Sequence, residues 1–389
     1  MRVLLVSETL HAGGAETFVL RLCRKLNEVG IACDILNLNP DIENPNLLDY
    51  YKDLTIKRVP LPFLKWIKRL DNLLRVLSVD FSLQTFLTKK WIERKVISNY
   101  SVFHTHLIKV DYLFSLIKEE YPDLKVVSTV HGDYSDYYNK AKEGQDIRWL
   151  NLFKKVGFIK ERINKWVVIS DEQLDFFSNE LKLPSSKVVK LYNGFSANFS
   201  NKSAPIQNKV FTIGMVSRGV KLKGWSVLVE AFLKMPQDCQ LNLVGVGDYI
   251  DKLKEQYERH PRINFVGFHP NPVDEIVKLD VFVLPSLFPY ESLPTVIIEA
   301  LYCGKPVIAT RVGEIPSMVF DPSSKEDAGF LLDFDGSSLS VDQLYDYLMA
   351  YYSNRNLLLA HSALAKKAFQ KFDMNNCVNN YVQIYSNLS

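Results

Sequence analysis

The sequence lacks the features that mark disulfide-rich, zinc-binding or membrane-spanning proteins. Its five cysteines form no Cys-x-x-Cys pair, which argues against a disulfide framework or a zinc site and favours a reducing compartment. No apolar run approaches the ~20 residues that a membrane span requires. The formal net charge is only +3, so charge gives no reason to expect a nucleic-acid partner. We therefore expect a cytoplasmic protein without a metal-binding cluster of cysteines and histidines.

Short β-branched segments alternate with longer amphipathic ones along the 389 residues. A chain of this length exceeds the size at which one hydrophobic core keeps growing, so two domains are expected. Near-continuous apolar strands between helices predict parallel sheets covered on both faces, in two doubly wound α/β domains. The polar stretch at 197–205 breaks the pattern and predicts domains at 1–198 and 206–372. The expected strands lie at 3–6, 33–36, 102–104, 126–130, 167–169, 188–191, 211–216, 241–244, 263–266, 281–284 and 306–309.

Gly13 and Gly14 follow the first expected strand and precede an amphipathic segment. Glycine at a strand-to-helix turn lets the backbone approach a phosphate, and the N-terminus of a helix favours negative charge. The complete Gly-x-Gly-x-x-Gly fingerprint is absent, so a tight turn without a function explains this pair equally well.

A basic loop follows the first strand of the second domain and contains Arg218, Lys221 and Lys223. Cations after the carboxyl end of a parallel strand suit a diphosphate. Arginine can bind it through two hydrogen bonds, whereas lysine supplies a point charge. A solvated basic loop without a ligand is the alternative.

The segment from Glu291 to Glu299 is the strongest functional pattern. It follows an apolar strand and opens an apolar helix, with Pro294 expected at the first helical position. The amides of Thr295 and Val296 could then bind a phosphate, and the two carboxylates could accept hydrogen bonds from hydroxyls of a nucleotide sugar. Charges at a helix terminus are the alternative, which explains Glu291 but not a glutamate inside the apolar helix.

Histidines end two neighbouring strands of the first domain. His131 directly follows the strand at 126–130, which places it over the crevice at the carboxyl ends of the sheet. A structural role is more common for such a histidine. That role applies more strongly to His104 and His106 on the preceding strand, although either could line an acceptor pocket.

In this order along the chain, the four patterns resemble glycosyltransferase family 4. That family has the GT-B fold, an α/β architecture of two Rossmann-like, doubly wound parallel-sheet domains facing a central cleft. The matching segments lie at 13–16, 129–132, 168–170, 192–194, 214–218, 223–224, 243–247, 266–268, 285–286, 291–299 and 304–310. The chain departs from the family at Gly313-Glu314, where two glycines are common, and after Glu291, where Gly-Phe-Gly is frequent.

The resemblance implies a retaining transferase that uses a nucleotide sugar without a metal. Arg218 and Lys223 match the pair that holds the diphosphate, Glu291 the carboxylate on the donor sugar, Glu299 the one on the ribose, and His131 the active-site histidine. The reaction residues implied are His131, Arg218, Lys223 and Glu291, and the nucleotide-sugar-binding residues are Gly13, Gly14, Phe268, Leu293, Thr295, Val296 and Glu299. The C-terminal helix, 375–389, is expected to pack back on the first domain. Asp333 and Asp335 spell the Asp-x-Asp of metal-dependent glycosyltransferases, but we interpret them as a turn.

The expected reaction moves a hexose-type sugar from a UDP-sugar, in preference to a GDP-sugar, to a glycan or lipid-linked glycan. Surface polysaccharide or glycolipid synthesis is the expected setting. A GT-B nucleotide-sugar epimerase is the alternative enzyme, and a catalytically silent GT-B scaffold or partner subunit is the alternative from another class.

The segment 57–95 carries ten basic and three acidic residues. Apolar residues within it are spaced for one helical face, and a basic amphipathic helix with tryptophan suits an anionic membrane surface. Packing of that face on the domain's own sheet is the alternative, and it is preferred. The stripe comprises Phe63, Leu64, Trp66, Ile67, Leu70, Leu73, Leu74 and Leu77.

Overall fold

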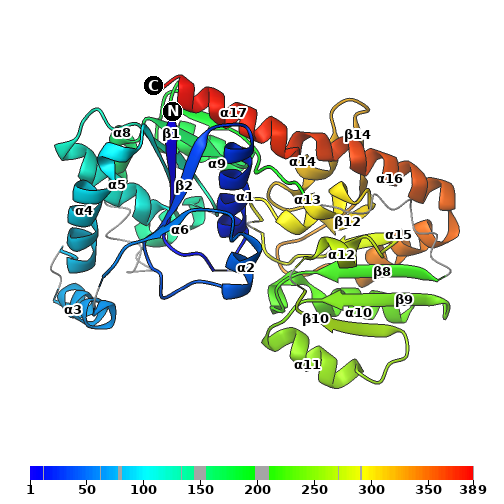
Figure 1. The fold of residues 1–389 in the computed structure, drawn as a ribbon. Helices are drawn as coiled ribbons and strands as arrows, with labels where there is room; N and C mark the ends of the chain where they lie inside the picture. Colours follow the sequence, from blue (N-terminus) through cyan, green and yellow to red (C-terminus); the bar gives the residue numbers. More distant parts are fainter. Residues whose placement is uncertain are drawn as a thin grey trace. The chain divides into compact units, whose positions relative to one another are not determined.

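The structure is a computed structural model that describes residues 1–11, 13–61, 63–77, 81–132, 134–143, 155–197, 210–269, 271–289 and 291–388 (Figure 1). The chain forms two compact units, Met1–Gly194 with Met374–Ser389, and Phe195–Asp373. The predicted domain ends at 198 and 206 lie outside the described residues.

The described strands of the first unit form one parallel sheet in the order β3-β2-β1-β4-β5-β6-β7. The direction of winding reverses between β1 and β4, and such a switch point creates a crevice outside the carboxyl ends of the strands. The strands are β1 (Arg2–Ser7), β2 (Ala32–Asn37), β3 (Ile56–Arg58), β4 (Val102–His106), β5 (Val126–Thr129), β6 (Lys165–Val168) and β7 (Val188–Lys190).

Helices cover both faces of this sheet, and β1 shows why the strands are apolar throughout. Leu4 and Val6 belong to one core, whereas Val3 and Leu5 belong to the other. Helix α17, at the C-terminus, packs with α1 in the second of these cores. The helices are α1 (Gly14–Glu28), α2 (Pro45–Tyr50), α3 (Leu64–Val76), α4 (Leu83–Lys95), α5 (Ile108–Glu120), α6 (Tyr134–Lys142), α8 (Val156–Arg162), α9 (Asp171–Asp175) and α17 (Met374–Ser386).

The second unit repeats this topology, with described strands in the order β10-β9-β8-β11-β12-β15, all parallel. Its switch point lies between β8 and β11. The strands are β8 (Phe211–Val216), β9 (Cys239–Val244), β10 (Ile263–Gly267), β11 (Val281–Leu284), β12 (Val307–Thr310), β15 (Gly329–Leu332) and the antiparallel pair β13 (Phe320–Asp321) and β14 (Glu326–Asp327). The helices are α10 (Trp225–Leu233), α11 (Asp248–Tyr257), α12 (Val273–Ile276), α13 (Thr295–Tyr302), α14 (Ile315–Val319), α15 (Val341–Ser353) and α16 (Arg355–Phe369).

The preferred interpretation of the stripe at 63–77, an apolar face packed on the domain's own sheet, is wrong for much of α3. Leu64 and Ile67 are buried, but Trp66, Leu73 and Leu70 are 66%, 55% and 42% exposed. The helix packs against the neighbouring helix α4 instead. Within the described residues, no helix is both long and apolar enough to cross a bilayer.

Candidate active site

The basic loop and the Glu291–Glu299 segment leave the second sheet at the neighbouring strands β8 and β11. These strands flank the switch point, so the carboxyl ends of both strands open onto the same crevice. The sequence analysis predicted that each segment follows a strand, and the sheet topology brings the two segments together.

Lys223 and Glu291 form an ion pair between these two segments. Their side chains are only 11% and 8% exposed, so water screens the pair little. Ser286, two residues after β11, donates a hydrogen bond from Oγ to Oε1 of Glu291 at 2.6 Å. The Glu291 carboxylate therefore binds both the Lys223 ammonium and the Ser286 hydroxyl at a position that is largely shielded from solvent.

Glycines allow the backbones around this ion pair to approach closely. Gly224 has a φ of +77°, and a Cβ there would lie 1.8 Å from the carbonyl oxygen of Pro285. Gly313 has a φ of +50°, and a Cβ there would lie 2.1 Å from the carbonyl oxygen of Glu291. The backbone amide of Glu314 donates to that oxygen at 3.0 Å, so the backbone at Gly313-Glu314 holds the backbone of Glu291 in place.

Arg218 is placed differently from Lys223. Its side chain is exposed, and no ion pair within the described ranges involves it. Its carbonyl accepts a hydrogen bond from Nε1 of the fully buried Trp225 at 3.0 Å, which fixes the loop backbone. One loop thus carries a solvent-exposed guanidinium at Arg218 and a buried, ion-paired ammonium at Lys223.

Helix α13 begins at Thr295, and Pro294 is its N-cap, so the prediction that Pro294 is the first helical residue is wrong by one position. No side chain caps this end, and the first amides of a helix have no intrahelical partner. Thr295 and Val296 are half-buried, so their amides remain candidates for a phosphate. Glu299 lies within the same helix and is 4% exposed.

Two further predicted residues differ in their surroundings. Leu293 is buried beside the start of α13. Phe268 follows the edge strand β10 and is 56% exposed, so its ring is available to a flat ligand group such as a base.

In the first unit, Gly13 is the N-cap of α1, and Gly14 is the first helical residue. Gly13 has an ordinary extended backbone, with φ −117°, and its carbonyl accepts a hydrogen bond from the amide of Thr17 at 3.0 Å. No side chain caps this helix, so its N-terminal amides can meet an anion. Ala12, the residue before this pair, lies outside the described residues.

His104, His106 and His131 form a buried group that we call the histidine cluster. His106 Nδ1 lies 2.9 Å from His131 Nε2, and the two rings stack with centroids 5.2 Å apart. The His104 ring lies 4.3 Å from that of His106. His104 is hydrogen-bonded through Nδ1 to the Tyr385 hydroxyl and through Nε2 to the Thr129 hydroxyl, each at 2.7 Å.

Burial keeps this cluster neutral. It lowers the pKa of His131 to about 3 and lowers the pKa values of His104 and His106 well below the ordinary value. At neutral pH His131 is therefore an uncharged hydrogen-bonding group, and it supplies no positive charge. Asp133, two residues after His131, lies outside the described residues.

Sequence reasoning missed several partners of the predicted residues. Ser286 was noted only as part of a family motif, and Tyr381 and Tyr385 were not noted at all. Tyr381 hydrogen-bonds to Thr129 at 2.8 Å, so α17 reaches the ends of the strands that support His131. A short-range pattern contains no signal for a contact with residues more than 250 positions away.

Asp335 behaves as predicted for a turn. Its carboxylate accepts hydrogen bonds from the amides of Ser337 and Ser338, both at 2.8 Å, and these bonds lower its pKa. Asp333 accepts a hydrogen bond from Gln343 at 2.8 Å. Among the described residues, no group of three or more histidine, cysteine, aspartate or glutamate side chains is arranged to hold a metal ion.

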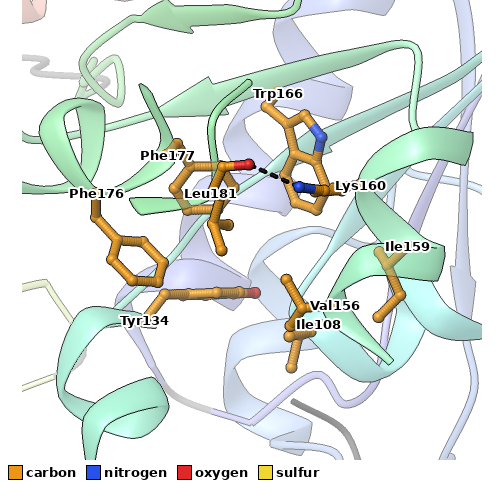
Figure 2. Close-up of a pocket in the computed structure, with 9 residues that line it drawn as sticks. All are labelled: Ile108, Tyr134, Val156, Ile159, Lys160, Trp166, Phe176, Phe177 and Leu181. Atoms are coloured by element: carbon orange, nitrogen blue, oxygen red, sulfur yellow. Dashed lines mark hydrogen bonds between the residues drawn. The ribbon is translucent and has the colours of Figure 1, made fainter. Parts of the chain in front are cut away.

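An apolar pocket lies elsewhere in the first unit (Figure 2). Its charged residue, Lys160, donates from Nζ to the carbonyl oxygen of Leu181 at 2.8 Å. None of the predicted site residues lines it, so it is not the predicted sugar site. The lining residues are Ile108, Tyr134, Val156, Ile159, Lys160, Trp166, Phe176, Phe177 and Leu181.

Both halves of the chain match models of known families. Residues 12–199 match the model described as Glycosyltransferase Family 4, and residues 208–346 match the one described as Glycosyl transferases group 1. The chain is 24% identical to N-acetyl-α-D-glucosaminyl L-malate synthase of Bacillus anthracis, over 77% of this chain and 78% of that protein. It is also 24% identical to the O-antigen biosynthesis glycosyltransferase WclY of Escherichia coli, over 75% of this chain and 80% of that protein.

Similar solved structures include Anabaena HepE in complex with UDP. It matches 100% of both chains with a TM-score of 0.76 and 17% identity. A complex of the same protein with UDP-glucose matches with a TM-score of 0.73, 17% identity and 100% coverage of both chains. At this identity the likeness shows the fold alone, and it confirms the predicted fold of two Rossmann-like domains.

Proposed function

The chain belongs to glycosyltransferase family 4, and from that premise we propose that it transfers a hexose-type sugar from a UDP-sugar to a glycan or lipid-linked glycan. We propose retention of configuration, no metal requirement, and a role in surface polysaccharide or glycolipid synthesis. The UDP and UDP-glucose complexes of HepE support a UDP-sugar donor in preference to a GDP-sugar. The O-antigen enzyme among the relatives supports the polysaccharide setting.

The buried Lys223–Glu291 pair at the switch point is the observation on which this proposal rests. Loss of a nucleoside diphosphate builds negative charge on the oxygen that bridged sugar and phosphate. Lys223, the exposed Arg218 and the amides at the start of α13 can stabilise this charge without a metal. Removing one such donor typically lowers the rate about 100-fold or more.

The surroundings of the candidate groups disfavour a covalent intermediate on the protein. Oε1 of Glu291 already accepts from Lys223 and Ser286, which reduces its nucleophilicity. The low pKa of His131, about 3, makes it a poor base for the acceptor hydroxyl. In the proposed reaction the bond from the sugar carbon to the phosphate oxygen breaks, and the acceptor oxygen bonds to that carbon on the same face. A phosphate oxygen of the leaving group takes the acceptor's proton.

A thermal-shift titration with UDP, GDP and a panel of their sugars, run in EDTA, tests the donor site. At 100 times its dissociation constant a ligand stabilises the protein by about 2.7 kcal/mol. We expect a shift with UDP compounds that persists in EDTA, is lost in Lys223→Ala and is retained in Lys221→Ala. Lys221 is the matched control because it lies on the same loop but is exposed. No shift with any nucleotide would refute the proposal, and a shift that requires added metal would refute metal independence.

Product analysis tests the reaction itself. We expect free nucleotide to be released only when an acceptor is added, and the new glycosidic bond to keep the donor's anomeric configuration, as read by proton NMR. Interconversion of nucleotide sugars without an acceptor would instead identify an epimerase. An inverted product would refute retention.

We also propose that the outer face of α3 binds an anionic membrane surface from the cytoplasmic side. Trp66 on this helix and Phe63, the residue before it, are exposed apolar residues, and exposed Lys65 and Arg69 lie at the same helix end. The Arg69 guanidinium lies 5.1 Å from the centre of the Trp66 ring, which joins the apolar and basic parts of the surface.

The charge available for a membrane is smaller than the sequence count indicates. Three of the described basic residues in 57–95 pair with carboxylates on the same element or on neighbouring ones, and these pairs neutralise them. The ion pairs are Arg58–Glu43, Lys89–Glu93, Lys89–Glu120, Lys90–Glu93 and Lys90–Glu120. Lipid attraction should therefore depend mainly on α3.

Flotation with anionic vesicles at low salt tests this surface. Replacing Lys65 and Arg69 together by glutamine should weaken binding about 30-fold, because each basic residue near an anionic surface contributes about 1 kcal/mol. Trp66→Ser should weaken binding as well. Leu359→Ser should not, although Leu359 is 48% exposed on α16 of the second unit. Equal flotation of all variants, or no flotation of the parent, would refute the membrane proposal.

A further inference from the structure

We propose that His106 is a positioning residue that fixes the tautomer of His131, so that His131 presents Nδ1–H to a substrate oxygen. This inference rests on the proposed function, because it assigns His131 a substrate contact. It also makes a statement about the free protein, namely which ring nitrogen of His131 carries the proton.

The contact between the two rings requires one proton and one lone pair. His106 Nδ1 and His131 Nε2 lie 2.9 Å apart, and burial keeps both rings neutral at pH 7. One ring must therefore donate and the other accept, because two lone pairs or two N–H groups would repel at this distance. The choice of donor decides what His131 offers to a ligand.

The far side of His106 decides between the two arrangements. His106 is 1% exposed, and its Nε2 has no hydrogen-bond partner among the described residues. If His131 donated, His106 would carry its proton on Nε2, where a buried N–H would lack an acceptor. If His106 donates, Nε2 is an unused lone pair. Buried N–H groups without a partner are rarer than buried acceptors without a donor, so the donor is His106 Nδ1–H.

Donation from His106 leaves the proton of His131 on Nδ1. Within the described part of the chain no group hydrogen-bonds to that nitrogen, and it is not among the fully enclosed polar atoms that lack a partner. His131 Nδ1–H is therefore a neutral donor that can meet an incoming oxygen. A phosphate or a sugar hydroxyl can accept from it without any change in protonation.

The rest of the cluster holds the His106 ring in place. The His104 ring packs against it at an interplanar angle of 36°, and both nitrogens of His104 are engaged by hydroxyl groups, from Thr129 and Tyr385. Phe18 lies against His131 with ring centroids 5.7 Å apart. These contacts restrict rotation of the rings, so the hydrogen bond between His106 and His131 keeps its geometry before any substrate arrives.

Nitrogen NMR of the full-length protein, labelled with ¹⁵N-histidine and free of substrate, tests the tautomer directly. His131→Gln identifies its signals by their loss. We expect the parent His131 to be protonated at Nδ1. In His106→Leu this preference should disappear, whereas His106→Asn should retain it, because the asparagine amide N–H can occupy the position of Nδ1. His131 protonated at Nε2 in the parent would overturn the inference, as would an unchanged tautomer in His106→Leu.

Kinetics supply the second readout. His106→Leu should lower kcat/KM for sugar transfer about 10- to 100-fold, the loss expected for one hydrogen bond to a charged or strongly polar group. His106→Asn should restore most of this loss. Equal activities of the two variants, at matched melting temperature, would overturn the positioning role. If His106→Leu does not fold, the parent spectrum and His106→Asn still decide. A failure of sugar transfer in the parent would refute the proposed function and leave the tautomer test intact.

Discussion

Removing Lys223 should destabilise the second unit as well as weaken donor binding, because the lysine compensates a buried carboxylate. In Lys223→Met a side chain of similar length replaces the ammonium. Among the described residues, Glu291, which is 6% exposed, then keeps only the hydroxyl of Ser286 as a partner on Oε1. Breaking a buried ion pair by removing one partner typically costs about 3–5 kcal/mol. Because the hydrogen bond from Ser286 remains, we expect a loss of stability at the lower end of this range, about 3 kcal/mol.

A double-mutant cycle separates this effect from the loss of lysine packing. Glu291→Gln keeps the shape of the side chain and removes its charge, and the double variant contains neither charge. We expect the double variant to be more stable than Lys223→Met alone, with a coupling free energy of about 2 kcal/mol or more. In scanning calorimetry the single variant should melt about 6–12 °C lower, since about 1 kcal/mol shifts a unit of this size by about 2–4 °C.

Lys221→Met is the matched control for this cycle, because Lys221 is exposed on the same turn. It should change stability by less than about 0.5 kcal/mol. A coupling free energy near zero would show that Lys223 and Glu291 are not paired in solution. The inference that the folded protein holds the Lys223 charge in place at the switch point would then be wrong. The argument that the leaving group is stabilised without a metal would be wrong with it.

Three further predictions follow from the same structure. Gly313→Ala should lower both stability and sugar transfer, because its Cβ would meet the carbonyl oxygen of Glu291. Gly267→Ala, with φ +80° and open space around it, should show only the backbone strain of about 1–2 kcal/mol. Glu299→Gln should weaken UDP in calorimetric titrations while pyrophosphate binding is unchanged, because its proposed partner is the ribose. Acidification from pH 6.5 to 5.5 should destabilise the first unit by about 2 kcal/mol in urea titrations. Because the pKa values of the histidine cluster are lowered in the folded protein, the cluster takes up protons on unfolding, and each proton changes the free energy of unfolding by about 1.4 kcal/mol per pH unit. Asp111, whose pKa is raised to about 7, releases a proton on unfolding and so offsets one of these protons. An unchanged urea midpoint would contradict these shifts.

The central strands were predictable because each is buried on both faces. The alternating contributions of β1 to two cores require apolar residues at every position, and such runs are visible without a structure. The edge strands β3 and β15 were missed. β3 is only Ile56–Arg58, with two basic residues, so it shows no apolar run, and β15 has only three apolar side chains after Gly329, which is too short a run to distinguish a strand from its surroundings.

The candidate site was predictable only as a set of positions at strand ends. The family resemblance assigned Lys223 and Glu291 to one donor site, and parallel topology accounts for it because it brings the carboxyl ends of their strands together. The contact itself depends on the paths of the two loops, which are fixed by Gly224 and Gly313. Nothing in a local pattern indicates that a carboxylate will pair with the lysine, or that the histidines will contact one another.

Burial has different effects on the ionisable groups of the two units. In the second unit, burial makes a lone charge costly, so Lys223 and Glu291 are kept together in the folded protein. An ammonium has three N–H donors and a carboxylate has two oxygens, so the pair can bind a phosphate through Lys223 and a hydroxyl through Glu291 while it stays intact. In the first unit, burial removes charge from the histidine cluster and leaves a neutral donor at His131. Burial has therefore already desolvated Lys223, Glu291 and His131, three of the groups proposed to contact the substrate, so little reorganisation of these groups remains for the proposed reaction.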